Sequence, residues 1–212
     1  EGKTFVSTNL AATLAKASKK VLLLDFDLHK PKVHKMFRTT NTMGVSTYLI
    51  GKASFEEVVF NSDIENLDVV LAGPVPPNAS ELILSAKVDE LVAEGLKHYD
   101  YVIIDTPPIM LITDSLVLLS KVDRGILVMN TLKATKQGVN YLEDVLTQNS
   151  LTNTSILLNN IKQKRWRYYY GKYAYRYGYG YGYGYGYGYG YGYGYGYGGY
   201  GEESKGKKKK DK

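Results

Sequence analysis

Apolar residues in the first three quarters of the chain gather into short runs with the length of β-strands. Several of these runs are apolar at almost every position, rather than at every second one. Such runs are typical of strands that are covered on both faces, as in parallel sheets. The pattern predicts strands at residues 21–25 (VLLLD), 67–72 (LDVVLA), 101–105 (YVIID), 125–130 (GILVMN) and 155–159 (SILLN).

Amphipathic segments lie between these runs and place their apolar residues at helical spacing. The spacing predicts helices over residues 4–18, 80–97 and 136–149, with Ser80 as the N-cap of the second. Strands that alternate with helices indicate an α/β fold, a doubly wound and mostly parallel sheet.

The apolar periodicity ends near Lys162, where a stretch of low complexity begins. Fourteen of the 21 tyrosines lie from Tyr173 onward, most of them alternating with glycine. Glycine at every second position costs backbone entropy and leaves one face of a strand without side chains. We therefore predict two parts, a folded domain over residues 1–161 and a disordered Tyr/Gly-rich tail over residues 162–212.

The charge is divided between these two parts. The whole chain has a net charge of +6, but residues 162–212 hold twelve Lys and Arg against three Asp and Glu. Residues 1–161 hold fifteen basic and eighteen acidic residues, so the excess positive charge belongs to the tail. A basic tail attracts phosphate groups of nucleic acids or of anionic lipids.

Two compositional features exclude whole classes of protein. The chain has no cysteine, which rules out a disulfide framework or a cysteine-ligated metal. No apolar run approaches the roughly 18–20 residues that a membrane-spanning helix needs. The abrupt opening EGKTF, without an initiator Met or a signal peptide, is typical of a fragment.

The first motif that carries chemistry is EGKT, residues 1–4, which matches the second half of a phosphate-binding loop. In such a loop Gly2 lets the backbone curl around phosphate oxygens, Lys3 neutralises phosphate charge, and Thr4 ligates Mg²⁺. The N-terminal amides of the following helix point at the anion. A match of only four residues can also arise by chance at the start of a chain.

The second and third motifs are acidic strand ends. Asp25 ends the first predicted strand, Asp27 follows two residues later, and Asp105 ends the run YVIID. The two-residue period of a strand would place Asp25 and Asp27 on the same side of the strand end. Carboxylates of this kind hold Mg²⁺ or accept a proton from an attacking hydroxyl, although each also fits a solvated turn. Ligands bind at the carboxyl ends of strands in doubly wound sheets, so we expect Lys3, Thr4, Asp25 and Asp105 to converge on a nucleotide site.

Together these motifs resemble the Walker A, A′ and B motifs of the bacterial tyrosine kinases (BY-kinases). The matching stretches are EGKTFVSTNLA, VLLLDFDLHKPKVH and YVIIDTPP, and residues 73–88 (GPVPPNASELILSAKV) are similar to a further stretch of the family. The resemblance covers roughly residues 1–161, and the Tyr-rich C-terminus completes it. It implies a P-loop NTPase fold of the MinD/ParA-like type, with ATP and Mg²⁺ as cofactors.

The resemblance also implies a role for individual residues. Lys3, Asp25 and Asp27 would be catalytic, with Asp25 as the base or orienter of the tyrosine hydroxyl. Gly2, Lys3, Thr4 and Asn159 would bind the nucleotide, Asn159 near adenine, although a turn residue is an equal reading of Asn159. The metal ligands would be Thr4, Asp25, Asp27 and Asp105.

Two residues depart from the family pattern. His29 replaces an arginine, and a neutral imidazole cannot make the bidentate contacts of a guanidinium. We expect His29 to be a solvated loop residue. Ala79 replaces a proline, which is expected only to loosen a loop.

The family implies that the kinase phosphorylates its own tail on a neighbouring subunit and controls capsule and exopolysaccharide synthesis and export. The expected phosphoacceptors are Tyr168, Tyr169, Tyr170, Tyr173, Tyr175, Tyr177, Tyr179 and Tyr200. Expected partners are further copies in a ring held by tail-to-site docking, a transmembrane activator or fused membrane domain, and a tyrosine phosphatase, but no nucleic acid. The expected location is the cytoplasmic face of the bacterial inner membrane.

In this family a strand and the start of the phosphate loop precede the EGKT motif. We expect both to be missing from this chain, so that it binds ATP weakly and has little or no activity. Two other functions fit parts of the sequence. One is a MinD/ParA-like positioning ATPase that phosphorylates nothing, and the other is a nucleic-acid-binding role for the basic, Tyr-rich tail.

Overall fold

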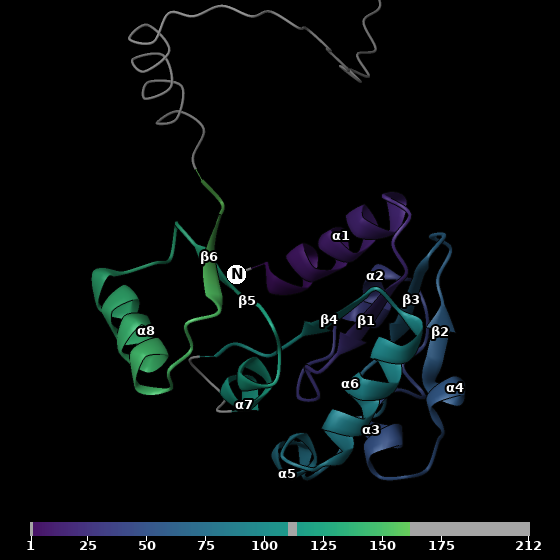
Figure 1. Cartoon of the computed structure of the whole chain (residues 1–212). Helices are drawn as coiled ribbons and strands as arrows, with labels where there is room; N and C mark the ends of the chain where they lie inside the picture. Colours follow the sequence, from purple (N-terminus) through teal and green to yellow (C-terminus); the bar gives the residue numbers. More distant parts are fainter. Residues whose placement is uncertain (1, 110–113, 162–212) are drawn as a thin grey trace, which may run out of the picture. The chain divides into compact units, whose positions relative to one another are not determined.

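The computed structural model of the chain describes residues 2–109 and 114–161, all within one compact unit, Glu1–Gln163. Helices and strands alternate along most of this unit (Figure 1). The elements are α1 (Lys3–Lys16), β1 (Val21–Asp25), α2 (Val33–Met36), α3 (Val45–Leu49), α4 (Phe55–Val58), β2 (Val59–Asn61), β3 (Leu67–Val70), α5 (Ala79–Ile83), α6 (Lys87–His98), β4 (Tyr101–Asp105), α7 (Asp114–Ser120), β5 (Gly125–Asn130), α8 (Lys136–Gln148) and β6 (Thr154–Asn159).

The main sheet has the order β2-β3-β1-β4. Strands β3, β1 and β4 are parallel, whereas the short edge strand β2 runs antiparallel to β3. In the described part of the chain, β5 and β6 form a second, two-stranded parallel sheet. The predicted α/β fold with a mostly parallel sheet is confirmed, and the antiparallel β2 and the division into two sheets were not predicted.

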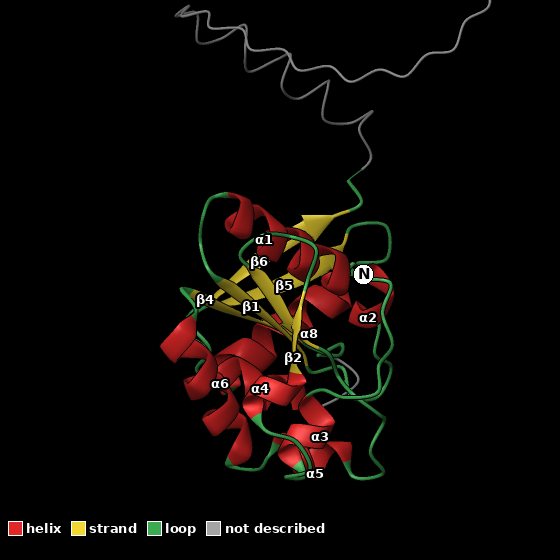
Figure 2. Cartoon of the chain, turned by 90° about the vertical axis from the view of Figure 1, so that its right-hand side faces the viewer, coloured by secondary structure: helices red, strands yellow, loops and turns green. Residues whose placement is uncertain are grey.

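Helices cover both faces of the main sheet, α1 on one side and α6 with α3 on the other (Figure 2). The alternation of side chains along β1 explains this arrangement. Leu22 and Leu24 pack in the cluster that includes α3 and α6, while Val21 and Leu23 pack against α1. All four side chains are fully buried, as expected for a strand inside a doubly wound sheet.

The prediction of one helix over residues 80–97 was wrong, because the segment forms α5 and α6. The buried side chains Ala79 and Ile83 are four residues apart, but the next buried one, Val88, follows after five. In one continuous helix, a step of five residues would place Val88 about 140° around the helix axis from Ile83. One straight helix could not bury both sets, so the chain breaks between them. The N-cap of α5 is Asn78 rather than the predicted Ser80.

Three strands have the predicted bounds, namely β1, β4 and β5, and β6 begins one residue earlier than predicted. Strand β3 ends at Val70, two residues short of the prediction. The helices α2, α3, α4 and α7 were not predicted, because each is too short for apolar periodicity to appear. The predicted tail, residues 162–212, lies outside the described residues, and the domain boundary at residue 161 stays a prediction.

Candidate functional site

The N-terminus of α1 carries the residues of the predicted phosphate loop. Gly2 precedes the helix in the left-handed region, with φ 97°, a conformation that favours glycine. The amide of Val6 donates to the Gly2 carbonyl, so helical hydrogen bonding starts at once. No acidic side chain lies in the first turn of α1. The backbone amides at this end of α1 and the positive end of the helix dipole therefore suit an anion.

Asp105 lies directly against this helix terminus. The Ser7 hydroxyl donates to Asp105 Oδ1 at 3.0 Å, and Thr4 also donates to the Asp105 carboxylate. Burial raises the pKa of Asp105, while the two hydroxyl donors and the positive charge of Lys3 oppose that rise. The structure thus brings Lys3 and Thr4 to Asp105, as the sequence predicted.

Asp25 is fully buried at the end of β1. Its Oδ1 accepts from the Asp27 amide at 3.1 Å, and its Oδ2 accepts from the Val33 amide at 3.3 Å. Burial and the neighbouring Asp105 carboxylate raise the pKa of Asp25 to about 7, against these two donors. A carboxylate with a pKa near the working pH suits a general base.

Asp27 follows the end of β1 and is half-buried. Its Oδ1 accepts from the Lys30 amide at 3.0 Å, which closes a turn of the loop beyond the strand. The predicted reason for its position was the two-residue period of a strand, but β1 ends at Asp25. The turn, and not the strand, therefore holds the Asp27 carboxylate.

Asn159 ends β6 and lies next to Gly2, although 157 positions separate them in the sequence. A Cβ atom on Gly2 would overlap the Asn159 side-chain amide. Asn159 Oδ1 accepts from the amide of Asn160 at 2.9 Å, and its carbonyl accepts from Thr131. The predicted contact of Asn159 with adenine stays a prediction, but its side chain does reach the phosphate-loop residues.

The donor set fits a magnesium ion that accompanies a nucleotide. Within residues 2–109 and 114–161, no three carboxylate or imidazole side chains come close enough to hold a metal by themselves. Mg²⁺ usually binds one or two carboxylates and completes its shell with phosphate oxygens and waters. Asp25 and Asp105 are two neighbouring buried carboxylates whose pKa values are raised, and a cation beside them would relieve their repulsion.

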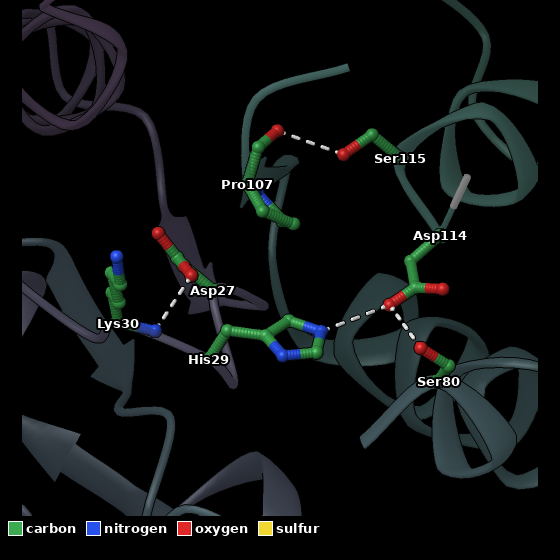
Figure 3. Close-up of polar contacts among 7 residues, drawn as sticks. All are labelled: Asp27, His29, Lys30, Ser80, Pro107, Asp114 and Ser115. Carbon is green, nitrogen blue, oxygen red and sulfur yellow. Dashed lines mark hydrogen bonds and ion pairs between the residues drawn. The ribbon is translucent and has the colours of Figure 1, made fainter. Parts of the chain in front are cut away.

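A contact network beside these acids was not predicted. His29 is an exposed loop residue, as expected, but its Nε2 also lies 3.2 Å from Asp114 Oδ2, a contact that was not predicted. The same oxygen accepts from Ser80 Oγ at 3.0 Å (Figure 3). These residues come from three distant segments, so no spacing in the sequence signals the network. Ser7 was missed as well, although its position three residues after Thr4 places both hydroxyls on one helix face.

A cavity of about 160 Å³ between β5 and α8 does not coincide with this site. Its walls are mainly apolar and include Leu127, Met129, Val139 and Leu142. None of the predicted site residues lines it. The buried carboxylates at the strand ends, and not the size of a cavity, identify the candidate site.

The predicted phosphoacceptor tyrosines lie outside the described residues.

Comparison with known proteins identifies the family of this chain. Residues 1–158 match the family model described as an AAA domain. The chain is 38% identical to the putative tyrosine-protein kinase CapB of Staphylococcus aureus, with 81% of this chain and 76% of CapB covered. It is 39% identical to the tyrosine-protein kinase YwqD of Bacillus subtilis, with 81% and 73% covered. The match to wzc of Salmonella typhi, at 38% identity, spans only 24% of that larger protein.

Solved structures give the same relationship. The kinase domain of the Escherichia coli tyrosine kinase ETK superposes with a TM-score of 0.72 at 34% identity, covering 87% of this chain and 68% of ETK's. The chimerical protein CapA2B2 superposes with a TM-score of 0.70 at 32% identity, covering 76% of this chain and 72% of its own. MinD of Pyrococcus horikoshii, solved with Mg-ADP, has a TM-score of 0.58 at 23% identity, covering 74% and 63%. That likeness shows a shared fold alone. The chain belongs to the bacterial tyrosine kinase (BY-kinase) family.

Proposed function

We propose that this protein is an ATP-dependent tyrosine autokinase that phosphorylates the C-terminal tyrosine cluster of a neighbouring copy. The observation that carries the proposal is the contact of the α1 N-terminus with the buried carboxylate of Asp105, beside the buried carboxylate of Asp25. Thr4 and Ser7 donate to Asp105, and Asp105 is the register partner of Asp25. A phosphate-binding helix end beside a proton acceptor is what transfer to a phenol requires.

In the proposed reaction the phenol oxygen of a tail tyrosine attacks the γ-phosphorus of ATP. A new O–P bond forms, the bond between the γ-phosphorus and the bridging oxygen breaks, and ADP leaves. The phenol proton passes to the Asp25 carboxylate, whose pKa of about 7 suits the transfer. Lys3 and the α1 amides hold the phosphates, and Mg²⁺, when bound through Thr4, Asp105, Asp25 or Asp27, would neutralise phosphate charge.

The tail suits the role of substrate and switch. It holds fourteen tyrosines from Tyr173 onward and a net positive charge, and it is carried by the same chain as the site. Each phosphate would add about −1.5 to −2 charges, so several would cancel the charge of the tail. Unphosphorylated tails would dock in neighbouring sites and hold a ring of copies, and phosphorylated tails would be released.

The proposed setting of the kinase is at a membrane, together with a second component. Among the structurally similar proteins is the chimerical CapA2B2, which supports a second component beside the kinase. We propose a transmembrane activator or a fused membrane domain, a cognate tyrosine phosphatase, and a location at the cytoplasmic face of the inner membrane. None of the helices that the structure describes is long and apolar enough to cross a membrane. Control of capsule or exopolysaccharide synthesis would be the physiological output.

The test is incubation of the chain with Mg-ATP, followed by phosphopeptide mapping by mass spectrometry. Weak activity suffices, because the method detects a small phosphorylated fraction. We expect phosphotyrosine within residues 168–200, lost in Lys3→Met and retained in Lys16→Met, a matched change at the far end of α1. Phosphate on serine alone, or no difference between the two variants, would contradict the proposal and favour an ATPase without kinase activity.

A further inference from the structure

The Asp114 carboxylate joins three separate segments of the chain. Its side chain is 3% exposed, and its Oδ2 contacts both Ser80 Oγ of α5 and His29 Nε2 of the loop after β1 (Figure 3). Buried carboxylates are retained where their oxygens find donors. A single oxygen therefore links the loop after β1 to α5 and to the first residue of α7.

The next residue of α7 makes a parallel contact. Ser115 is buried, and its Oγ donates to the carbonyl of Pro107 at 2.8 Å. His29 lies two residues after the candidate ligand Asp27, and Pro107 lies two residues after Asp105. The first two residues of α7 thus contact the two loops that follow the acidic strand ends.

These contacts matter because the sheet does not fix Asp27. Asp105 is the last residue of β4 and is paired with Asp25, so the ladder sets its position. Asp27 lies beyond β1, where its amide donates to Asp25 and its carboxylate accepts from the Lys30 amide in a turn. His29 lies inside that turn, and its contact with Asp114 ties the turn to the rest of the fold.

We propose that the His29–Asp114 contact is a brace that sets the position of Asp27 relative to Asp105. His29 and Asp114 are positioning residues, because neither touches the reacting atoms. The brace holds the carboxylate oxygens at the spacing that a divalent cation needs beside a nucleotide. The identity of the ligand, a nucleotide with a divalent cation, rests on the proposed function. The brace itself rests only on the contacts of His29, Asp114 and Ser115.

The first test measures amide hydrogen exchange in the full chain and needs no nucleotide. His29 is 37% exposed, so His29→Ala should leave the fold intact. Loss of one hydrogen-bonded contact should speed exchange of the Lys30 amide by about five- to tenfold. His98→Ala removes a similar histidine–carboxylate contact, to Glu94, far from the site and should leave the Lys30 amide unchanged. His29→Gln keeps a donor of similar reach and should restore slow exchange.

The second test measures binding of ADP with Mn²⁺ as the probe cation. His29→Ala should raise the Mn²⁺ concentration for half-saturation by at least threefold, whereas His29→Gln and His98→Ala should match the unsubstituted chain. Equal Lys30 exchange in His29→Ala and the unsubstituted chain would overturn the brace. Faster exchange with unchanged Mn²⁺ half-saturation would overturn the positioning role. If the unsubstituted chain bound no Mn-ADP, the proposed function would fail, and the exchange comparison would still decide the brace.

Discussion

Asp25 and Asp105 face each other as register partners at the ends of the adjacent parallel strands β1 and β4. Each is buried, and the charge of Asp105 is the second cause, after burial, of the raised pKa of Asp25. Two carboxylates that repel each other in a buried site store unfavourable electrostatic energy that a cation would relieve. The pair is therefore the electrostatic centre of the candidate site.

The first prediction concerns stability against pH. The pKa of Asp25 is about 7 in the folded chain, against the ordinary aspartate value of 3.8 in the unfolded chain. Between these pH values the folded chain holds a proton that the unfolded chain has lost. The free energy of unfolding should then fall as the pH rises from about 4 to about 7, by an amount of the order of 3–4 kcal/mol. Denaturant titrations across this range measure the slope.

Asp25→Asn should flatten that slope, since the group that titrates is gone. Asp100→Asn is the matched control, because Asp100 is an exposed carboxylate that accepts from the Lys20 amide. It should leave the slope as it is in the unsubstituted chain. An equal slope in Asp25→Asn would show that Asp25 does not titrate in this range.

The second prediction concerns the approach of Gly2 to Asn159. Gly2→Ala should destabilise the fold by about 1–2 kcal/mol, because alanine is strained at φ 97°. It should also abolish nucleotide binding, because the new methyl group would displace the Asn159 amide. Calorimetric titration with Mg-ADP and thermal melting measure the two effects.

The variant Gly51→Ala is a control that separates the effect of backbone strain from the effect of displacing the Asn159 side chain. Gly51 has a φ of 75°, and its new methyl group would meet only the flexible end of Lys87. The stability loss should be similar, but nucleotide binding should remain. Loss of binding in both variants would mean that global destabilisation, and not the contact with Asn159, removes the site.

The third prediction concerns Ser7, which donates to Asp105. Ser7→Ala should raise the pKa of Asp105 further and weaken Mg-nucleotide binding by about fivefold, the usual effect of one lost hydrogen bond. Ser7→Thr keeps the hydroxyl and should restore binding. Thr13→Ala removes an exposed hydroxyl of the same helix, bonded to the Asn9 carbonyl, and should change nothing. Unaltered binding in Ser7→Ala would contradict a role for Ser7 in the site.

The fourth prediction concerns the tail. If many tyrosines serve as interchangeable substrates, changing half of those in residues 168–200 to phenylalanine should reduce total phosphorylation by about half. The number of tyrosines would then matter more than any one position. Abolition of phosphorylation by a single Tyr→Phe change would contradict this graded behaviour.

The sequence patterns predicted most of the strands and most of the candidate site, because both depend on local features of the chain. A strand buried on both faces must be apolar throughout, and β1 is such a strand. Strands β4 and β5 are apolar runs of the same kind, although their side chains are partly exposed, so all three appear in the sequence with their final bounds. Parallel strands end at the same edge of a sheet, so Asp25 and Asp105 could be placed together without coordinates. The short helices α2, α3, α4 and α7 have fewer than two turns each and left no periodic signal.

The sequence by itself determined the class of fold, the positions of its main strands along the chain and the residues that meet at the phosphate loop. Apolar runs and strand ends are local properties of the chain, so they can be recognised without the tertiary structure. The tertiary structure decided the contacts between distant segments. It brought the exposed His29 into contact with Asp114, 85 positions away, and placed the Ser80 hydroxyl at the same oxygen. It also divided the segment 80–97 into two helices. Both outcomes depend on how elements that are distant in the sequence pack against one another, and a local sequence pattern carries no information about that packing.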